Sequence, residues 1–236
     1  MKSLSAIPFV LVVAACGGSD LDPGAGDDPG QGTSTLAVEA NVSANARVDN
    51  ARNAGEFDTE MTVRITKNGA DVTTGTVTMT SASGTVTLMF DTTEDRNRWR
   101  AIAAGYEEVY LLDIESGEDN LTGVRVDGPD IHTFTSPAPR AEIDSTVALV
   151  VTWSRDDQAD SASIRAEEID DISMPDSGSY MLAANSLKAK REETEENELR
   201  IRRTNRVTPE GAAGGSVMSI TVDNRMTVVA APNPAL

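Results

Sequence analysis

The chain has 236 residues, with 20 Lys and Arg against 38 Asp and Glu, and a formal net charge of -18. Such an acidic surface repels nucleic acid, so nucleic-acid binding is excluded. The single cysteine allows no intramolecular disulfide, and the single histidine excludes a zinc site built on several imidazoles.

The N-terminal residues have the pattern of an export signal. Lys2 precedes an apolar run over residues 4–15, which is too short to cross a bilayer as a helix. The run ends in Val13-Ala14-Ala15-Cys16, a string that resembles the lipobox of bacterial lipoproteins. The resemblance implies that residues 1–15 are removed and that Cys16 is lipidated with several acyl chains, which hold a protein firmly at a membrane. It also implies the outer membrane, because no aspartate directly follows Cys16, and it leaves the leaflet open.

Residues 16–34 are expected to form a lipidated cysteine followed by a flexible linker. After Cys16 the segment is almost entirely Gly, Pro, Asp and Ser, which offer little to bury. A chain of this length and composition has an end-to-end distance of about 20–25 Å. The sequence therefore predicts a folded part held close to the membrane by a loose tether.

From residue 35 the sequence predicts an all-β fold, because short β-branched runs alternate with turn residues. The strands expected in the first half are 36–46, 57–67, 74–80, 85–91, 98–103, 108–114, 124–126 and 131–134. Those expected in the second half are 146–153, 162–167, 179–182, 198–206, 217–222 and 225–230. Residues 187–197 are expected to be a short helix or a loop.

Two tandem antiparallel β-sandwich domains are predicted from this pattern. The prolines of Ser136-Pro137-Ala138-Pro139 cannot donate ladder hydrogen bonds, so the domains are expected at 35–136 and 137–236. Asp176-Ser177-Gly178-Ser179-Tyr180 is similar to the tyrosine corner of immunoglobulin-like domains, with Trp153 as the core tryptophan. Together with the lipobox, the chain resembles Gram-negative bacterial lipoproteins with tandem immunoglobulin-like domains.

Few residues indicate catalysis or metal binding. No Gly-x-Ser-x-Gly motif accompanies His132, which is expected to be structural or on the surface. Carboxylates at strand ends are the ligands that calcium prefers, and the best candidates for a metal site are Asp156, Asp157, Asp160 and Asp176. Solvated loop charge is the alternative interpretation of these residues.

Charge on the strand 198–206 has two interpretations. Arg200 and Arg202 are expected on its solvent face, beside Arg203 and Arg206. They either discourage aggregation at a sheet edge or form a docking patch for a polyanionic glycan or an acidic partner.

The function predicted first is that of a non-enzymatic cell-envelope lipoprotein with a binding or structural role. Its partners would be the membrane, through the lipid anchor, and an envelope protein or glycan, with no cofactor unless calcium binds. The second hypothesis is a calcium-assisted carbohydrate-binding module with Trp99, Tyr106 and Tyr110 as stacking residues. An envelope hydrolase is the third.

Overall fold

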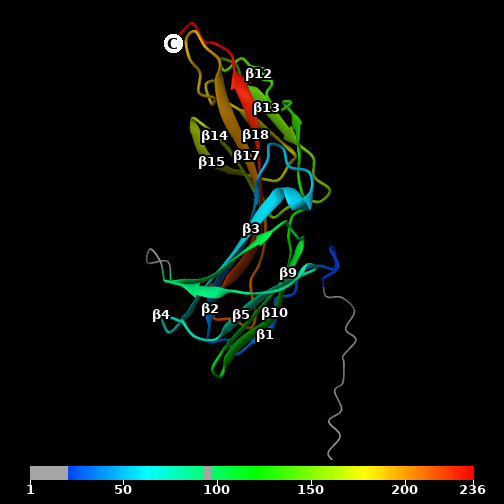
Figure 1. Ribbon diagram of the computed structural model, residues 1–236, viewed down its shortest axis with the longest axis vertical. Helices are drawn as coiled ribbons and strands as arrows, with labels where there is room; N and C mark the ends of the chain where they lie inside the picture. Colours follow the sequence, from blue (N-terminus) through cyan, green and yellow to red (C-terminus); the bar gives the residue numbers. More distant parts are fainter. Residues whose placement is uncertain (1–20, 93–96) are drawn as a thin grey trace, which may run out of the picture.

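The computed structural model describes residues 21–92 and 97–236, and its described part is built from strands (Figure 1). The strands of the first half are β1 (Gln31–Gly32), β2 (Ala37–Ala46), β3 (Phe57–Lys67), β4 (Ala70–Asp71), β5 (Thr76–Ser81), β6 (Gly84–Thr87), β7 (Met89–Asp91), β8 (Arg98–Ala104), β9 (Val109–Ser116), β10 (Asp119–Asp127) and β11 (Phe134–Ser136). Those of the second half are β12 (Glu142–Ile143), β13 (Leu149–Trp153), β14 (Ser161–Ala166), β15 (Ile169–Met174), β16 (Ser179–Leu182), β17 (Glu195–Val207) and β18 (Val217–Ala230). One 3-10 turn, η1 (Ala54–Glu56), precedes β3. The predicted all-β class is confirmed.

The strands form three sheets. A ten-stranded sheet has the order β15-β14-β17-β18-β2-β3-β8-β7, with β12 paired to β18 and β4 paired to β3. A five-stranded sheet, β1-β10-β9-β5-β6, faces its first half, and a three-stranded sheet, β11-β13-β16, faces its second half. The result is two sandwiches that share one long sheet (Figure 1).

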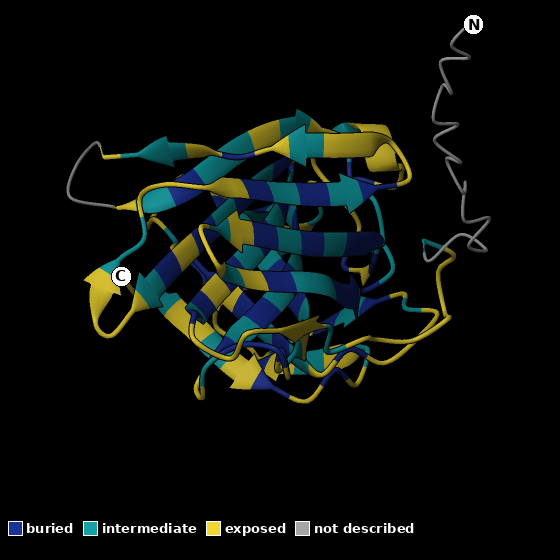
Figure 2. Ribbon diagram, turned by 90° about the horizontal axis from the view of Figure 1, so that it is seen from below, coloured by how far each residue is buried: buried dark blue, intermediate teal, exposed yellow. Residues whose placement is uncertain are grey.

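Each sandwich encloses its own apolar core. Strands alternate between inward and outward residues, as Figure 2 shows by the change of colour along each arrow. On β5, for example, Val77 and Met79 are buried while the threonines between them are half-buried. The first core includes Phe57, Trp99 and Leu112, and the second includes Trp153 and Ile164, which lie on the other side of residue 136 in the sequence.

Strands β17 and β18 run through both sandwiches. They pair with each other from Glu195 and Ala230 to Val207 and Met218 without a break. Residues 217–223 of β18 also pair in parallel with residues 39–45 of β2 and bring side chains into the first core. Two pairings, β18 with β2 and β12 with β18, are therefore parallel, which corrects the expectation of purely antiparallel sandwiches. The division into separate domains at residues 136 and 137 stays a prediction.

Several element bounds differ from those expected. Residues 217–222 and 225–230 belong to one strand, β10 extends well beyond 124–126, and β15 was not expected. Residues 187–194 are irregular and lead directly into β17, so this part of the chain adopts the loop alternative.

Residues 21–34, here called the N-terminal strap, lie along β10. Gln31 and Gly32 form β1 and pair with that strand. Further along, the Asp28 N–H donates to the Arg125 carbonyl at 3.0 Å, and the Arg125 N–H donates to the Asp28 carbonyl at 2.8 Å. The expected flexible linker is therefore wrong for the strap, because ladder hydrogen bonds fix its backbone. Residues 16–20 of that expectation lie outside the described residues.

Candidate functional site

A polar layer, here called the waist, separates the two cores. Leu199, Ile201 and Arg203 alternate on the inward face of β17, and Val222, Asn224 and Met226 do so on β18. Arg203 and Asn224 thus stand at positions where their neighbours are apolar, and both are fully buried. A buried polar side chain is costly without hydrogen bonds, so these two residues need partners.

Asn224 finds its hydrogen-bond partners in two loops. Its amide nitrogen donates to the Ala51 carbonyl at 2.8 Å and to the His132 carbonyl at 2.7 Å. Its amide oxygen accepts from the Ala51 N–H at 3.0 Å. Asn224 therefore joins the loop before η1, in the first sandwich, to the loop before β11, in the second.

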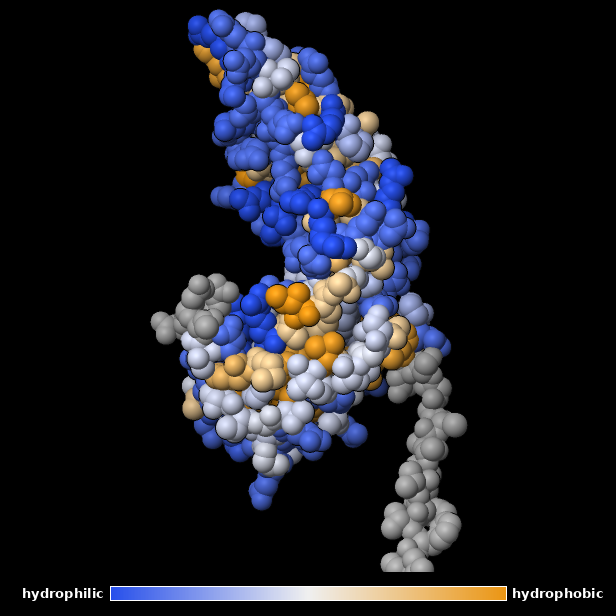
Figure 3. Space-filling view, in the orientation of Figure 1, coloured by the Kyte–Doolittle hydropathy of each residue, from blue (hydrophilic) through white to orange (hydrophobic). Residues whose placement is uncertain are grey.

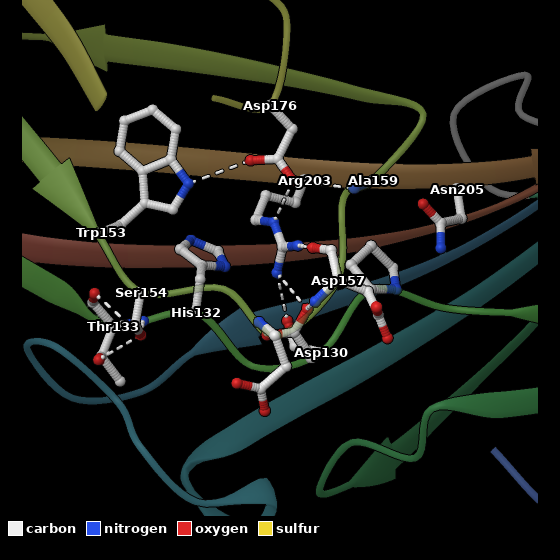
Figure 4. A network of polar contacts seen from close by, with 12 residues as sticks. Asp130, His132, Thr133, Trp153, Ser154, Asp157, Ala159, Asp176, Arg203 and Asn205 are labelled. Atoms are coloured by element: carbon white, nitrogen blue, oxygen red, sulfur yellow. Dashed lines mark hydrogen bonds and ion pairs between the residues drawn. The ribbon is translucent and has the colours of Figure 1, made fainter. Parts of the chain in front are cut away.

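Arg203 is bound by carboxylates on two sides (Figure 4). Its Nε lies 2.9 Å from Asp176 Oδ2, and its Nη1 lies 2.8 Å from both Asp130 Oδ1 and the Asp130 carbonyl oxygen. Nη2 donates to the Asp157 carbonyl. Opposite charges and hydrogen bonds together compensate the loss of water around the guanidinium.

The Asp176 carboxylate also accepts several hydrogen bonds. One carboxylate oxygen accepts from Trp153 Nε1 at 3.1 Å, and the other accepts from the Ala159 N–H at 2.8 Å as well as from Arg203. Burial raises the pKa of Asp176, but the Ala159 hydrogen bond and the Arg203 charge outweigh burial and lower it. Asp176 therefore stays ionised at neutral pH.

His132 is buried in the same layer. Its Nε2 lies 3.0 Å from the Ile201 carbonyl oxygen, and among the described residues its Nδ1 has no hydrogen-bond partner. Burial, and then the nearby Arg203 charge, lower the pKa of His132 to about 4. The ring is neutral at physiological pH and serves packing, as the sequence predicted for a structural histidine.

A cavity of about 280 Å³ opens at the edge of the waist. Pro23 and Gly24 of the strap form part of its wall. The carboxylates that line it are Glu108, Asp127, Asp130 and Asp157. Burial, and then the surrounding carboxylates, raise the pKa of Glu108. The local field of this cavity favours cations over anions.

Sequence reasoning missed most of this layer. Arg203 was grouped with Arg200 and Arg202, although its place two residues after Ile201 puts it on the inward face. That spacing is the signal that could have identified it. The positions of Asp130 and Glu108 depend on contacts between distant segments, and no local pattern marks them.

The four calcium candidates do not converge. Asp176 is bound by Arg203 in the interior, whereas Asp160 Oδ2 accepts from the Arg206 N–H at 2.8 Å near the surface. The N–H groups of Asp156 and Asp157 donate to Asp130. Among residues 21–92 and 97–236, no group of three or more His, Cys, Asp or Glu is arranged to hold a metal ion. Calcium binding itself stays a prediction.

The three aromatic candidates for sugar stacking lie inside the first core. Trp99, Tyr106 and Tyr110 are 6%, 2% and 2% exposed. Trp99 Nε1 donates to the Val72 carbonyl, and the Tyr106 hydroxyl donates to the Pro129 carbonyl. The expected stacking platform is therefore wrong, because a sugar cannot reach rings whose faces are covered.

The arginines of β17 are paired on the outer face of the long sheet. Arg200 and Arg202 both contact Asp223, at 2.8 and 2.7 Å. Arg202 also lies 2.7 Å from Asp171. Since these charges are compensated within the sheet, they offer little free positive charge to a polyanionic partner. β17 is also an interior strand of its sheet, so the edge-protection interpretation does not apply.

Cys16 lies outside the described residues. Within the part of the chain that the structure describes, no helix is long and apolar enough to cross a membrane. In Figure 3 the upper sandwich presents a mostly hydrophilic face, and apolar residues gather over the lower one.

Comparisons with known proteins do not identify a family. No family profile and no curated protein matches the chain. Similar solved structures include a two-domain fibronectin type III segment of chicken tenascin, at 13% identity over 79% of this chain and 98% of that one, with a TM-score of 0.23. Dpr11 IG1 bound to DIP-gamma IG+IG2 shows 12% identity over 83% and 98%, with a TM-score of 0.23. Fibronectin(III)-like modules of Clostridium thermocellum CbhA show 16% identity over 78% and 93%, also with a TM-score of 0.23. Similarities at this level carry no argument about function.

Proposed function

We propose that this protein is a lipid-anchored cell-envelope protein of the bacterial outer membrane, with a non-enzymatic binding or structural role. The observation that carries the proposal is the string Val13-Ala14-Ala15-Cys16 at the end of a short apolar run. A thiol at that position is the acceptor that diacylglycerol attachment requires, and several acyl chains give stable anchoring.

The waist supports a structural or binding role over a catalytic one. His132, the only histidine, is buried, and its Nε2 is bonded to a backbone carbonyl, so it has no open path to a substrate. Asp176 and Arg203 form hydrogen bonds with each other and with backbone groups, which leaves them little capacity to bind a substrate. Groups held in this way stabilise a shape and are poorly placed to move protons.

The proposal is tested by mass spectrometry of the protein made in a Gram-negative host. The expected product begins at Cys16, carries acyl chains on that residue and fractionates with the outer membrane. The variant Cys16→Ser is expected to keep its signal or remain unacylated. A wild-type product with a free thiol in the soluble periplasmic fraction would contradict the anchor.

The binding role is tested separately by chemical cross-linking in intact cells. An envelope protein or polysaccharide recovered with the lipidated chain supports it. Recovery of no partner, together with a measurable hydrolase turnover, would contradict it.

A further inference from the structure

The strap enters the fold at the waist, not at an end of the molecule. The N–H groups of Gly24 and Gly26 donate to Asp127 Oδ2 at 3.1 and 2.9 Å, and Asp127 ends β10. From there the strap runs antiparallel to β10 and reaches its other end, where Thr35 Oγ1 donates to Asp119 at 2.6 Å. In Figure 1 the dark blue start of the described chain lies near β9, at the edge of the lower sandwich that faces the upper one.

The covalent link between a lipid on Cys16 and this entry point is short. Residues 16 to 21 span at most about 17 Å when fully extended, at 3.3–3.6 Å per residue. The nine residues of β10 alone extend about 30 Å from the waist toward the far end of the first sandwich. The second sandwich extends a similar distance on the other side, along the nine residues 195–203 of β17.

These lengths restrict how the molecule can sit on a membrane. If it stood on the end of either sandwich, its waist would be about 30 Å above the lipid, beyond the reach of the link. We infer that the anchored molecule lies on its side, with the strap edge of the waist facing the lipid surface and both sandwiches extending along it. This inference rests on the lipid anchor proposed above.

Charge indicates that the link, and not the protein surface, holds this edge near the lipid. The strap carries exposed Asp22, Asp27 and Asp28, which anionic head groups repel. The acyl chains on Cys16, and not charged contacts of the strap, therefore bind the bilayer at this edge. The acidic cavity, whose wall includes Pro23 and Gly24, then opens close to that bilayer.

The orientation is tested by energy transfer from single labelled cysteines to the lipid surface. The chain has no cysteine besides Cys16, so Ala25→Cys, Glu118→Cys and Thr194→Cys each give one labelling site once Cys16 is acylated. All three positions are exposed, and they lie at the waist, at the end of the first sandwich and near the end of the second. The lipidated proteins are reconstituted in vesicles of phosphatidylethanolamine and phosphatidylglycerol that carry a head-group acceptor dye. The strongest transfer is expected from position 25.

A longer link provides the second measurement. Inserting about twelve Gly and Ser residues between Ser19 and Asp20 raises the fully extended length of the link to about 60 Å, at 3.3–3.6 Å per residue, and is expected to reduce the transfer from position 25. The same insertion in the exposed loop after Glu192 serves as the control and should leave that transfer unchanged.

Mass spectrometry of each preparation separates the two ways to fail. A product without acyl chains overturns the proposed anchor and this inference with it. A lipidated product whose transfer is stronger from position 118 or 194 than from position 25 overturns the orientation alone. The same holds if the longer link leaves the transfer from position 25 unchanged.

Discussion

Arg203 is the residue on which the waist depends most. Its side chain is 0% exposed and is paired with Asp176, which is also 0% exposed. Replacing it in Arg203→Met leaves a buried carboxylate without its cation, which typically costs about 3–5 kcal/mol. We expect urea unfolding followed by circular dichroism to show a loss of this size. Arg140→Met is the control, since the Arg140–Glu196 pair is 66% and 63% exposed and surface pairs contribute about 0–1 kcal/mol.

A double variant separates the two causes of the stability loss in Arg203→Met, the unpaired buried charge and the altered packing. Arg203→Met combined with Asp176→Asn removes the unpaired charge and keeps a side chain that can serve Trp153. The double variant should therefore be more stable than Arg203→Met alone. A double variant that is less stable than the single one would contradict the buried-charge explanation.

His132 makes stability depend on pH. Its pKa is lowered to about 4 in the folded protein, from an ordinary value of 6.5, because the ring is buried. The folded state therefore resists protonation, so stability is complete above pH 6.5 and falls as pH decreases toward 4, by about 3 kcal/mol for this group. Below that pH both states are protonated and the loss ends.

The single histidine makes the measurement direct. Its imidazole proton resonance should titrate with a midpoint near 4 in the folded protein and near 6.5 in urea. The variant His132→Gln should show a flatter pH dependence of the unfolding free energy between pH 4 and 6.5 than the wild type. A folded-state midpoint near 6.5 would place the ring in contact with water and contradict its burial.

At the scale of single elements, local patterns predicted most strands but not their continuity. The bounds of β3 and β16 agree with expectation because alternation and turn residues mark both ends. The sequence predicts two strands, 217–222 and 225–230, where the structure has the single strand β18. In the structure Asn224 keeps the inward phase of Val222 and Met226, and three of its side-chain hydrogen bonds are with segments far away in the sequence. No local rule could supply those partners.

The prediction of a flexible linker was wrong for the strap for a related reason. Its glycines predicted flexibility, but they permit close approach between backbones. A Cβ added at Gly30 would lie 2.6 Å from the Thr122 carbonyl oxygen, and one at Gly32 would lie 2.6 Å from that of Gly211. The same composition thus suits a loose tether and a tightly bound strand, and only β10 and the loop before β18 decide between them.

Asp127 should control how firmly the strap is held. In Asp127→Ala the N–H groups of Gly24 and Gly26 lose their shared acceptor. We expect faster amide hydrogen exchange in residues 21–30, with a local cost of about 1–3 kcal/mol. Glu118→Ala, an exposed change near the other end of β10, is the matched control. Equal exchange in the two variants would show that β1 alone holds the strap.

At the scale of the whole molecule, two cores and one shared sheet make opposite predictions about unfolding. Separate cores favour two transitions, as tandem domains often show. Continuous β17 and β18 favour one, because the first core cannot open without losing Met218 and Ile220, which lie on the strand that also closes the second. Asn224 and Arg203 add bonds between loops of both sandwiches.

We expect a single transition, and the two tryptophans can report it. Trp99 lies in the first core and Trp153 in the second, and the chain has no other tryptophan. In Trp99→Phe the remaining fluorescence follows the second core, and in Trp153→Phe it follows the first. In each variant the fluorescence midpoint in urea should coincide with the midpoint by circular dichroism, because the shared strands couple the cores. If either core instead melts at its own midpoint, the two sandwiches are independent folding units, as the proline-rich boundary at residues 136–139 first suggested.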